Sequence, residues 1–241
     1  MKIVLPKEHG TWVMLFLPYV LGIAVTTFKW VHLPFLIGWF FMYLSSTPWL
    51  NQLRNKRMRK RMRPWAFTYT GIGLLFAVPV MVVYAELFWL ALMIIPFFIV
   101  NIFFVIRKRE RHLLNDLSGI AILSLGAPAA FVIGTSALTQ DAFTLWAIVV
   151  FYFSGTAFYV KSLIRERKNT SFHKKSHLYH GFMLLVPWLF GFGTFMWALV
   201  PGTLKDWFTP RKRKIRPLVI GITEMCNAVL FFILTLVFAP V

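Results

Sequence analysis

The chain consists mostly of apolar runs that are long enough to cross a bilayer, and short basic segments separate them. A transmembrane helix needs roughly 20 predominantly apolar residues, with a range of about 17 to 25. The runs that meet this requirement cover residues 10–27, 31–50, 66–84, 88–106, 117–138, 143–160 and 217–239. Because 59% of the 241 residues are hydrophobic and only 14% are charged, a soluble domain of this size is excluded. We therefore predict an all-α polytopic membrane bundle that forms one multi-pass domain over residues 1–241.

The stretch 176–209 is either one helix or two helices broken at Gly191-Phe192-Gly193, since two glycines weaken a continuous helix. Lys and Arg in short loops accumulate on the cytoplasmic side of a membrane. If the stretch 176–209 forms two helices, the chain has about nine spans and a cytoplasmic N-terminus. In this topology 25 of the 26 basic residues lie on the cytoplasmic side, and only Lys29 lies on the other side of the membrane. The alternative of eight spans would export the basic block 211–216. The charge pattern favours nine.

A net charge of +18 would indicate a nucleic-acid-binding protein if it lay on a soluble surface. Here the basic residues occur in blocks between apolar runs, where they act as topology signals. We therefore expect membrane lipids and no nucleic acid as partners. The longer connections, 51–65, 107–116 and 161–175, are all on the predicted inner side, so any chemistry is expected at the cytoplasmic membrane surface.

Metal and cofactor ligands are sparse in the sequence. The single cysteine, Cys226, lies inside an apolar run and offers no disulfide or thiolate site. His177 and His180 form an i, i+3 pair, but no acidic or thiol side chain is near them in sequence, and two ligands do not make a metal site. We predict no metal and no cofactor.

Ionisable residues at the membrane boundary or within a span are costly unless they are paired or functional. Lys7, Glu8 and His9 stand together where the first run begins, and Glu224 lies about two turns into the last run. An anchor in which Lys7 meets lipid phosphate and Glu8 offsets the helix dipole explains these two residues equally well. These four residues and Tyr159, near the end of the sixth run, are candidate functional residues.

The strongest candidate anion site follows the sixth run. Lys161, Arg165 and Asn169 recur every four residues, so a helix that continued past the membrane would place all three on one face. With Arg167, and with Arg63 at the end of the dense basic tract 54–63, they could bind a phosphate or diphosphate headgroup through bidentate contacts. A solvated cytoplasmic turn and simple attraction to anionic lipid are the alternatives.

The segment Leu5-Pro6-Lys7-Glu8-His9-Gly10-Thr11-Trp12, with the stretches 159–169 and 221–224, resembles the YwiC-like family of bacterial membrane proteins over essentially the whole chain. Only Thr11 differs from the form expected for that family, which has Ala. This resemblance implies a multi-pass protein of the bacterial cytoplasmic (inner) membrane and implies no activity.

A more distant resemblance is to the UbiA-type intramembrane prenyltransferases, which are nine-helix bundles with functional segments after helices two, four and six. That family holds magnesium and a prenyl diphosphate with two aspartate-rich motifs. At the matching places this chain has Asn51 to Pro64 and Lys161-x-x-x-Arg165-x-x-x-Asn169. Both lack the aspartates, so the metal clamp is absent. The resemblance implies a UbiA-like arrangement that binds an anionic headgroup directly.

Three functions fit these features. The leading hypothesis is a UbiA-like bundle that binds an anionic lipid or isoprenoid headgroup at its cytoplasmic face, with or without catalysis. The alternatives are a permease for a small anion, with Glu8, His9 or Glu224 as a proton relay, and a non-catalytic membrane subunit.

Overall fold

A computed structural model describes residues 3–6, 10–211 and 214–238, and in these residues the only regular structure is helical. Ten α-helices and two short 3₁₀ turns follow one another along this part of the chain. They are α1 (Gly10–Ala24), α2 (His32–Arg54), η1 (Lys56–Met58), α3 (Arg59–Val83), α4 (Glu86–Ile106), α5 (Leu113–Ser124), α6 (Gly126–Thr135), α7 (Gln140–Ile164), α8 (Thr170–Leu189), η2 (Gly193–Phe195), α9 (Met196–Phe208) and α10 (Pro217–Phe238).

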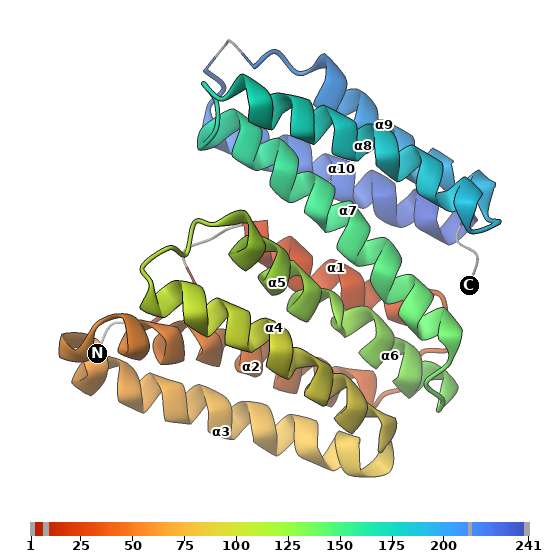
Figure 1. Cartoon of the computed structure of the whole chain (residues 1–241). Helices are drawn as coiled ribbons and strands as arrows, with labels where there is room; N and C mark the ends of the chain where they lie inside the picture. Colours follow the sequence, from red (N-terminus) through yellow and green to blue (C-terminus); the bar gives the residue numbers. More distant parts are fainter. Residues whose placement is uncertain (1–2, 7–9, 212–213, 239–241) are drawn as a thin grey trace. The chain divides into compact units, whose positions relative to one another are not determined.

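The chain divides into two compact units, Met1–Trp146 and Ala147–Val241. The first contains α1 to α6 and the start of α7, and the second contains the rest of α7 with α8, α9 and α10 (Figure 1). The expectation of one transmembrane domain stays a prediction.

The described residues confirm the nine helical segments. A single residue, Leu125, separates α5 from α6, and Leu113–Thr135 together form one apolar segment. The stretch after residue 176 contains two helices: α8 ends at Leu189 and α9 begins at Met196. Gly191 between them has a φ of +82°, a left-handed conformation that glycine adopts without steric cost. The cytoplasmic side of the N-terminus stays a prediction.

Five helical segments in the described residues are long and apolar enough to cross a membrane, judged by length and composition: Lys56–Val83, Glu86–Ile106, Leu113–Thr135, Gln140–Ile164 and Pro217–Phe238. Large apolar side chains also point outward, as at Leu75, Val82 and Val83, which are 68%, 70% and 73% exposed. An apolar outer surface on a helical bundle is typical of a protein whose solvent is lipid.

In the first unit, α1 packs closely on α6 because Gly22 lets the two backbones approach. A Cβ on Gly22 would lie 2.3 Å from the carbonyl oxygen of Ala127 and 2.9 Å from the Cβ of Ala130. Small residues at helix crossings allow such contact in membrane proteins, where van der Waals packing stabilises association. The surrounding core contains buried Tyr19 and Leu125.

We expect Gly22→Ala to lower the free energy of unfolding by about 1–3 kcal/mol, because the backbone of α6 must move to admit the methyl group. Gly71→Ala is the matched control, since nothing lies within 4 Å of the position of its Cβ. Detergent-solubilised Gly71→Ala should unfold at or slightly above the temperature of the wild type. Equal thermal stability of the two variants would contradict the close crossing.

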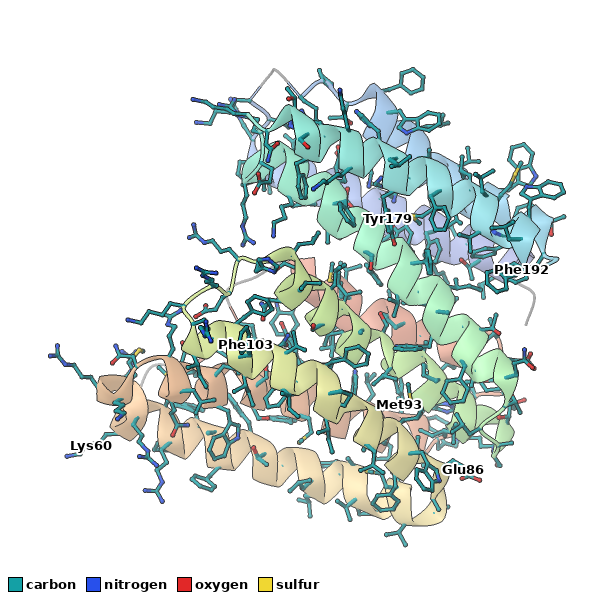
Figure 2. The ribbon with its side chains drawn as sticks, in the orientation of Figure 1. Lys60, Glu86, Met93, Phe103, Tyr179 and Phe192 are labelled. Carbon is teal, nitrogen blue, oxygen red and sulfur yellow. The ribbon has the colours of Figure 1, made fainter. Side chains whose placement is uncertain are left out.

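The predicted inner connection 51–65 is wrong in its extent. Helix α2 continues to Arg54, and α3 begins at Arg59 rather than at Ala66. Asn55 makes the break, because its side chain accepts a hydrogen bond from the Arg57 backbone N–H at 3.0 Å, as an N-capping residue does. The basic tract is therefore largely helical, and Figure 2 shows Lys60 projecting from it.

Candidate functional site

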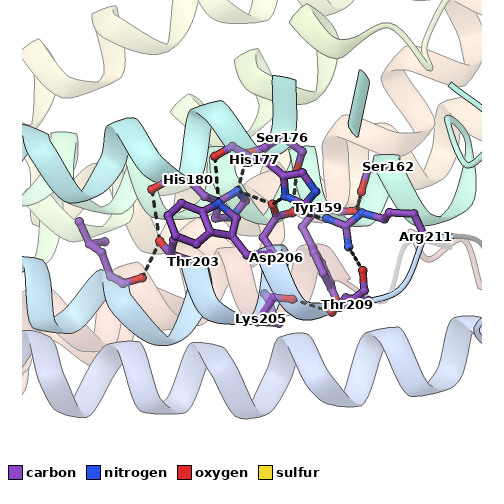
Figure 3. Close-up of polar contacts among 12 residues, drawn as sticks. Tyr159, Ser162, Ser176, His177, His180, Thr203, Lys205, Asp206, Thr209 and Arg211 are labelled. Atoms are coloured by element: carbon purple, nitrogen blue, oxygen red, sulfur yellow. Dashed lines mark hydrogen bonds and ion pairs between the residues drawn. The ribbon is translucent and has the colours of Figure 1, made fainter. Parts of the chain in front are cut away.

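The second unit contains a buried group of polar and charged side chains, which we call the Asp206 cluster. Helices α7, α8 and α9 and the segment after α9 contribute to it (Figure 3), and α10 adds Glu224 through its contact with Lys205. Its members are Tyr159, Ser176, His177, His180, Lys205, Asp206, Thr209, Arg211 and Glu224.

Asp206 lies at the centre, and its side chain is fully buried. Ser176 Oγ donates to its Oδ1 at 2.7 Å, and Arg211 Nη2 donates to the same oxygen at 2.5 Å. Nδ1 of His177 lies 2.6 Å from Oδ2, and Nδ1 of His180 lies 3.6 Å from it. The guanidinium and the two further donors supply the hydrogen bonds that a carboxylate needs when it is removed from solvent.

Arg211 reaches Asp206 because the chain turns back directly after α9. Thr209 ends the helix, and its carbonyl accepts from Arg211 Nη1 at 3.2 Å. The hydroxyl of Thr209 also lies 3.1 Å from that of Tyr159. The guanidinium of Arg211 lies 5.2 Å from the ring centroid of Tyr159, within range of a cation–π interaction. Tyr159 thus links α7 to the segment that carries the cation.

A second ion pair lies next to this group. Lys205 donates from Nζ to Oε1 of Glu224, which joins α9 to α10. The two side chains are only 10% and 13% exposed. Lys205 Nζ also lies 4.3 Å from the ring centroid of Tyr159. Tyr159 and Glu224, both predicted as candidates, therefore belong to one network of cations and carboxylates.

The prediction that a continuous helix carries the row of cations after the sixth run is wrong. Helix α7 ends at Ile164, and the Lys161 carbonyl accepts from the N–H groups of Arg165 and Glu166 at 3.0 and 2.8 Å, which closes the helix in a turn. Asn169 then caps α8, since its side chain accepts from the Phe172 N–H at 3.1 Å. Lys161, Arg165 and Asn169 therefore do not share one helix face, because α7 ends and α8 begins between the first and the last of them.

The turn between α7 and α8 nonetheless forms a pocket of about 480 Å³. Its lining residues are Arg165, Glu166, Lys168, Asn169, Thr170 and Ser171.

Two of the predicted anion-binding residues, Arg165 and Asn169, therefore line one pocket. Lys161 is buried one turn earlier in α7 and is 7% exposed, and Arg167 is half-buried and does not line the pocket. Arg63 is exposed in the first unit, with its guanidinium 5.6 Å from the Phe67 ring.

The candidates Lys7, Glu8 and His9 lie outside the described residues. The charged cluster members that the sequence did not single out are Asp206, Lys205 and Arg211. A carboxylate that lies inside a helix, in a chain with only eight acidic residues, was the signal for Asp206. The partners of Asp206 on α8 are 29 and 30 residues away in sequence, so spacing could not reveal them.

The described residues contain no group of three or more His, Cys, Asp or Glu side chains arranged to hold a metal ion. What the Asp206 cluster can do follows from its charges. Its carboxylates have cationic partners, and one histidine, His177, reaches the surface with 37% of its side chain exposed. Buried ionisable groups in apolar helices mark ligand or proton sites by default.

Comparison with known proteins bears on the whole chain. A family model described as "YwiC-like protein" matches residues 5–131. The chain is also 34% identical over 231 residues to a Bacillus subtilis (strain 168) protein described as "Uncharacterized protein YwiC", with 96% of each chain covered. The chain belongs to the YwiC-like family.

A second relative, described as an uncharacterized protein of Haemophilus influenzae, is 32% identical over 239 residues, which cover 98% of this chain and 99% of the relative. No solved structure matches the chain. Both relatives are bacterial and span both units, so their similarity includes the part of the chain that carries the Asp206 cluster. The resemblance to UbiA-type enzymes stays a prediction.

Proposed function

We propose that this YwiC-like protein binds the anionic headgroup of a membrane amphiphile, a phosphate-bearing lipid or isoprenoid, at the cytoplasmic face of the bacterial inner membrane. The pocket between α7 and α8 carries the proposal. It places the side chains of Arg165 and Lys168 at the N-terminus of α8. The proposal requires no catalytic step.

The electrostatics of this pocket support an anionic ligand. The first turn of a helix presents backbone N–H groups, and the helix dipole adds a partial positive charge there. Glu166 contributes the one acidic side chain, and its Oε2 accepts from Asn169 Nδ2 at 2.9 Å. Two cations and a helix N-terminus against one carboxylate leave the pocket positive.

An apolar surface next to the cations supports an amphiphile over a free anion. Ile164 at the end of α7 is 48% exposed, and Leu178 on α8 is 75% exposed. A lipid tail could lie along such side chains while the headgroup stays at the helix ends, which is how amphiphiles divide at a membrane interface. Lys161 and Arg167 remain proposed supporting cations of this pocket, whereas Arg63 lies in the first unit and stays a prediction.

The test is binding of farnesyl diphosphate and of inorganic diphosphate to the purified full chain in detergent. We expect farnesyl diphosphate to bind more tightly. Arg165→Gln/Lys168→Gln should weaken its binding about 10- to 100-fold, because charge-assisted hydrogen bonds contribute about 1.5–3 kcal/mol.

The control is Lys174→Gln/Lys175→Gln, which removes the same charge from exposed positions on α8 that do not line the pocket. Its affinity should stay within about twofold of the wild type. Equal losses in the two double variants would mean non-specific attraction and would overturn the site.

The Lys205–Glu224 pair supports a second candidate function, the proton-linked permease for a small anion. A carboxylate and an ammonium that are buried together inside apolar helices are the kind of pair that transporters use as a relay. Anion uptake by proteoliposomes that disappears in Glu224→Gln and persists in Arg165→Gln/Lys168→Gln would favour this candidate over headgroup binding.

A further inference from the structure

Helix α8 carries three histidines in three different hydrogen-bonding states. His173, His177 and His180 lie at i, i+4 and i+7, on neighbouring parts of the helix surface. The proton of a neutral imidazole lies on Nδ1 or Nε2, and the partner of one nitrogen decides the state of the other. The contacts of these three side chains therefore fix which ring nitrogen has a free electron pair.

His177 has its free electron pair on Nε2. The two oxygens of Asp206 accept from Ser176, Arg211 and Nδ1 of His177. A carboxylate that already has the guanidinium of Arg211 is ionised and can only accept, so Nδ1 of His177 carries the hydrogen. Nε2 then has the electron pair.

The other two histidines of α8 each lack either a free electron pair on Nε2 or an exposed side chain. Nε2 of His173 lies 3.0 Å from the carbonyl oxygen of Glu166, and a carbonyl only accepts, so Nε2 carries the hydrogen. Nδ1 of His180 donates to the Ser176 carbonyl at 2.9 Å, which leaves Nε2 with the electron pair. However, only 4% of the His180 side chain is exposed.

The histidines of the first unit differ from His177 as well. His32 accepts from the Lys29 N–H at Nδ1 and donates from Nε2 to the Ala130 carbonyl at 3.0 Å. His112 accepts at Nδ1 from the Leu114 N–H at 3.3 Å. In both rings Nε2 carries the hydrogen. Among the five described histidines, His177 alone combines an unprotonated Nε2 with a substantially exposed side chain.

We propose that His177 is a proton-accepting site of the second unit and that Asp206 is its positioning residue. Nε2 takes a proton from a water molecule or from a hydroxyl of a bound ligand. The O–H bond breaks, its electron pair stays on the oxygen, and an N–H bond forms at Nε2. The resulting imidazolium is held against the Asp206 carboxylate, an arrangement that enzymes use to orient a histidine base. Release of the proton reverses the step.

Several charged groups accompany this pair. Arg211 and Lys205 contribute positive charge from the segment after α9 and from α9 itself, and Glu224 on α10 offsets Lys205. On α8, exposed Lys174 and Lys175 precede His177 by three and two residues. Two exposed lysines within one turn of His177 give this part of α8 a polar face, as at the boundary between membrane and water.

Asp206→Asn reveals whether Asp206 positions the ring. Ser176 and Arg211 both donate to Oδ1, so the amide oxygen of the new side chain takes that place and its NH₂ group turns toward His177. An NH₂ group donates, so Nδ1 must accept and the hydrogen moves to Nε2. The substitution therefore removes the electron pair from Nε2 while the ring stays in place.

The test is the rate at which diethyl pyrocarbonate modifies each histidine of the full chain in detergent, measured by peptide mass spectrometry at a pH above the titration of histidine. In the wild type, His177 should react at least about tenfold faster than His180, which is buried, and faster than His173, whose Nε2 is protonated. Asp206→Asn should slow His177 by about tenfold and leave His173 unchanged.

Ser176→Ala separates orientation from general damage to the cluster, because it removes one donor to Asp206 and keeps the carboxylate. His177 should stay well above its rate in Asp206→Asn in this variant, because Nδ1 still donates to a carboxylate and Nε2 keeps its electron pair. The comparison of the three histidines within the wild-type protein needs no variant at all. His177 reacting no faster than His173 in the wild type, or at the wild-type rate in folded Asp206→Asn, would overturn the proposal. Neither result would affect the binding of farnesyl diphosphate between α7 and α8.

Discussion

Asp206→Ala should lower the free energy of unfolding of the protein by about 3–5 kcal/mol, because it leaves the guanidinium of Arg211 buried without its counter-charge. The side chain of Arg211 is 8% exposed and that of Asp206 is fully buried. Ser176 and His177 lose their acceptor in the same variant, so three donors to one carboxylate are affected. The measurement is unfolding by SDS titration in mixed micelles, followed by circular dichroism.

Asp141→Ala is the control for this experiment. Asp141 is exposed in the first turn of α7, where a carboxylate interacts only with the helix dipole, worth about 0.3–1 kcal/mol. An Asp206→Ala protein as stable as Asp141→Ala would show that the Asp206 cluster does not hold α8, α9 and the Arg211 segment together.

Glu224→Ala should have a similarly large effect, about 3–5 kcal/mol, since it leaves the ammonium of Lys205 between α9 and α10 without a carboxylate. The double variant Lys205→Met/Glu224→Leu should recover most of that loss, because apolar replacement of both members of a buried pair is often neutral or stabilising. The same unfolding titration measures all three proteins.

The exposed pair of the first unit provides the comparison. Arg54 and Glu110 lie 3.2 Å apart, with 47% and 35% of their side chains exposed. Glu110→Ala should cost no more than about 1 kcal/mol, because solvent screens such pairs. If the double variant Lys205→Met/Glu224→Leu is no more stable than Glu224→Ala, the loss of stability in Glu224→Ala does not come from the unpaired, buried ammonium of Lys205.

The sequence predicts helices well in this protein, because each span must be apolar over a length that the bilayer determines. The glycines at 191 and 193 marked the break between α8 and α9, and Gly191 does adopt a positive φ. The distribution of charge identified nine segments rather than eight. These signals are local in sequence, so they could be read without knowing which helices touch.

Helix ends were predicted less well, because basic residues continue a helix as readily as they end one. Charge alone placed the connection at 51–65, whereas Asn55 and Asn169 in fact mark the breaks by capping η1 and α8. Those caps move Arg59 into a helix and separate Lys161 from Asn169. Asparagine at such positions is the signal that corrects both boundaries.

The Asp206 cluster depends on tertiary contacts, and that explains why only parts of it could be predicted. Tyr159 and Glu224 stood out as a conspicuous aromatic and a carboxylate in apolar surroundings. The contact between Asp206 and His177 joins α9 to α8, and the contact between Lys205 and Glu224 joins α9 to α10. No periodicity within one helix encodes such pairs.

The headgroup site between α7 and α8 is tested by native mass spectrometry of the full chain, released from a mild detergent after purification from membranes. We expect the wild type and Lys174→Gln/Lys175→Gln to retain a phosphate-bearing amphiphile and Arg165→Gln/Lys168→Gln to lose it. Retention of only neutral lipids by the wild type, or equal retention by both double variants, would contradict a headgroup site between α7 and α8.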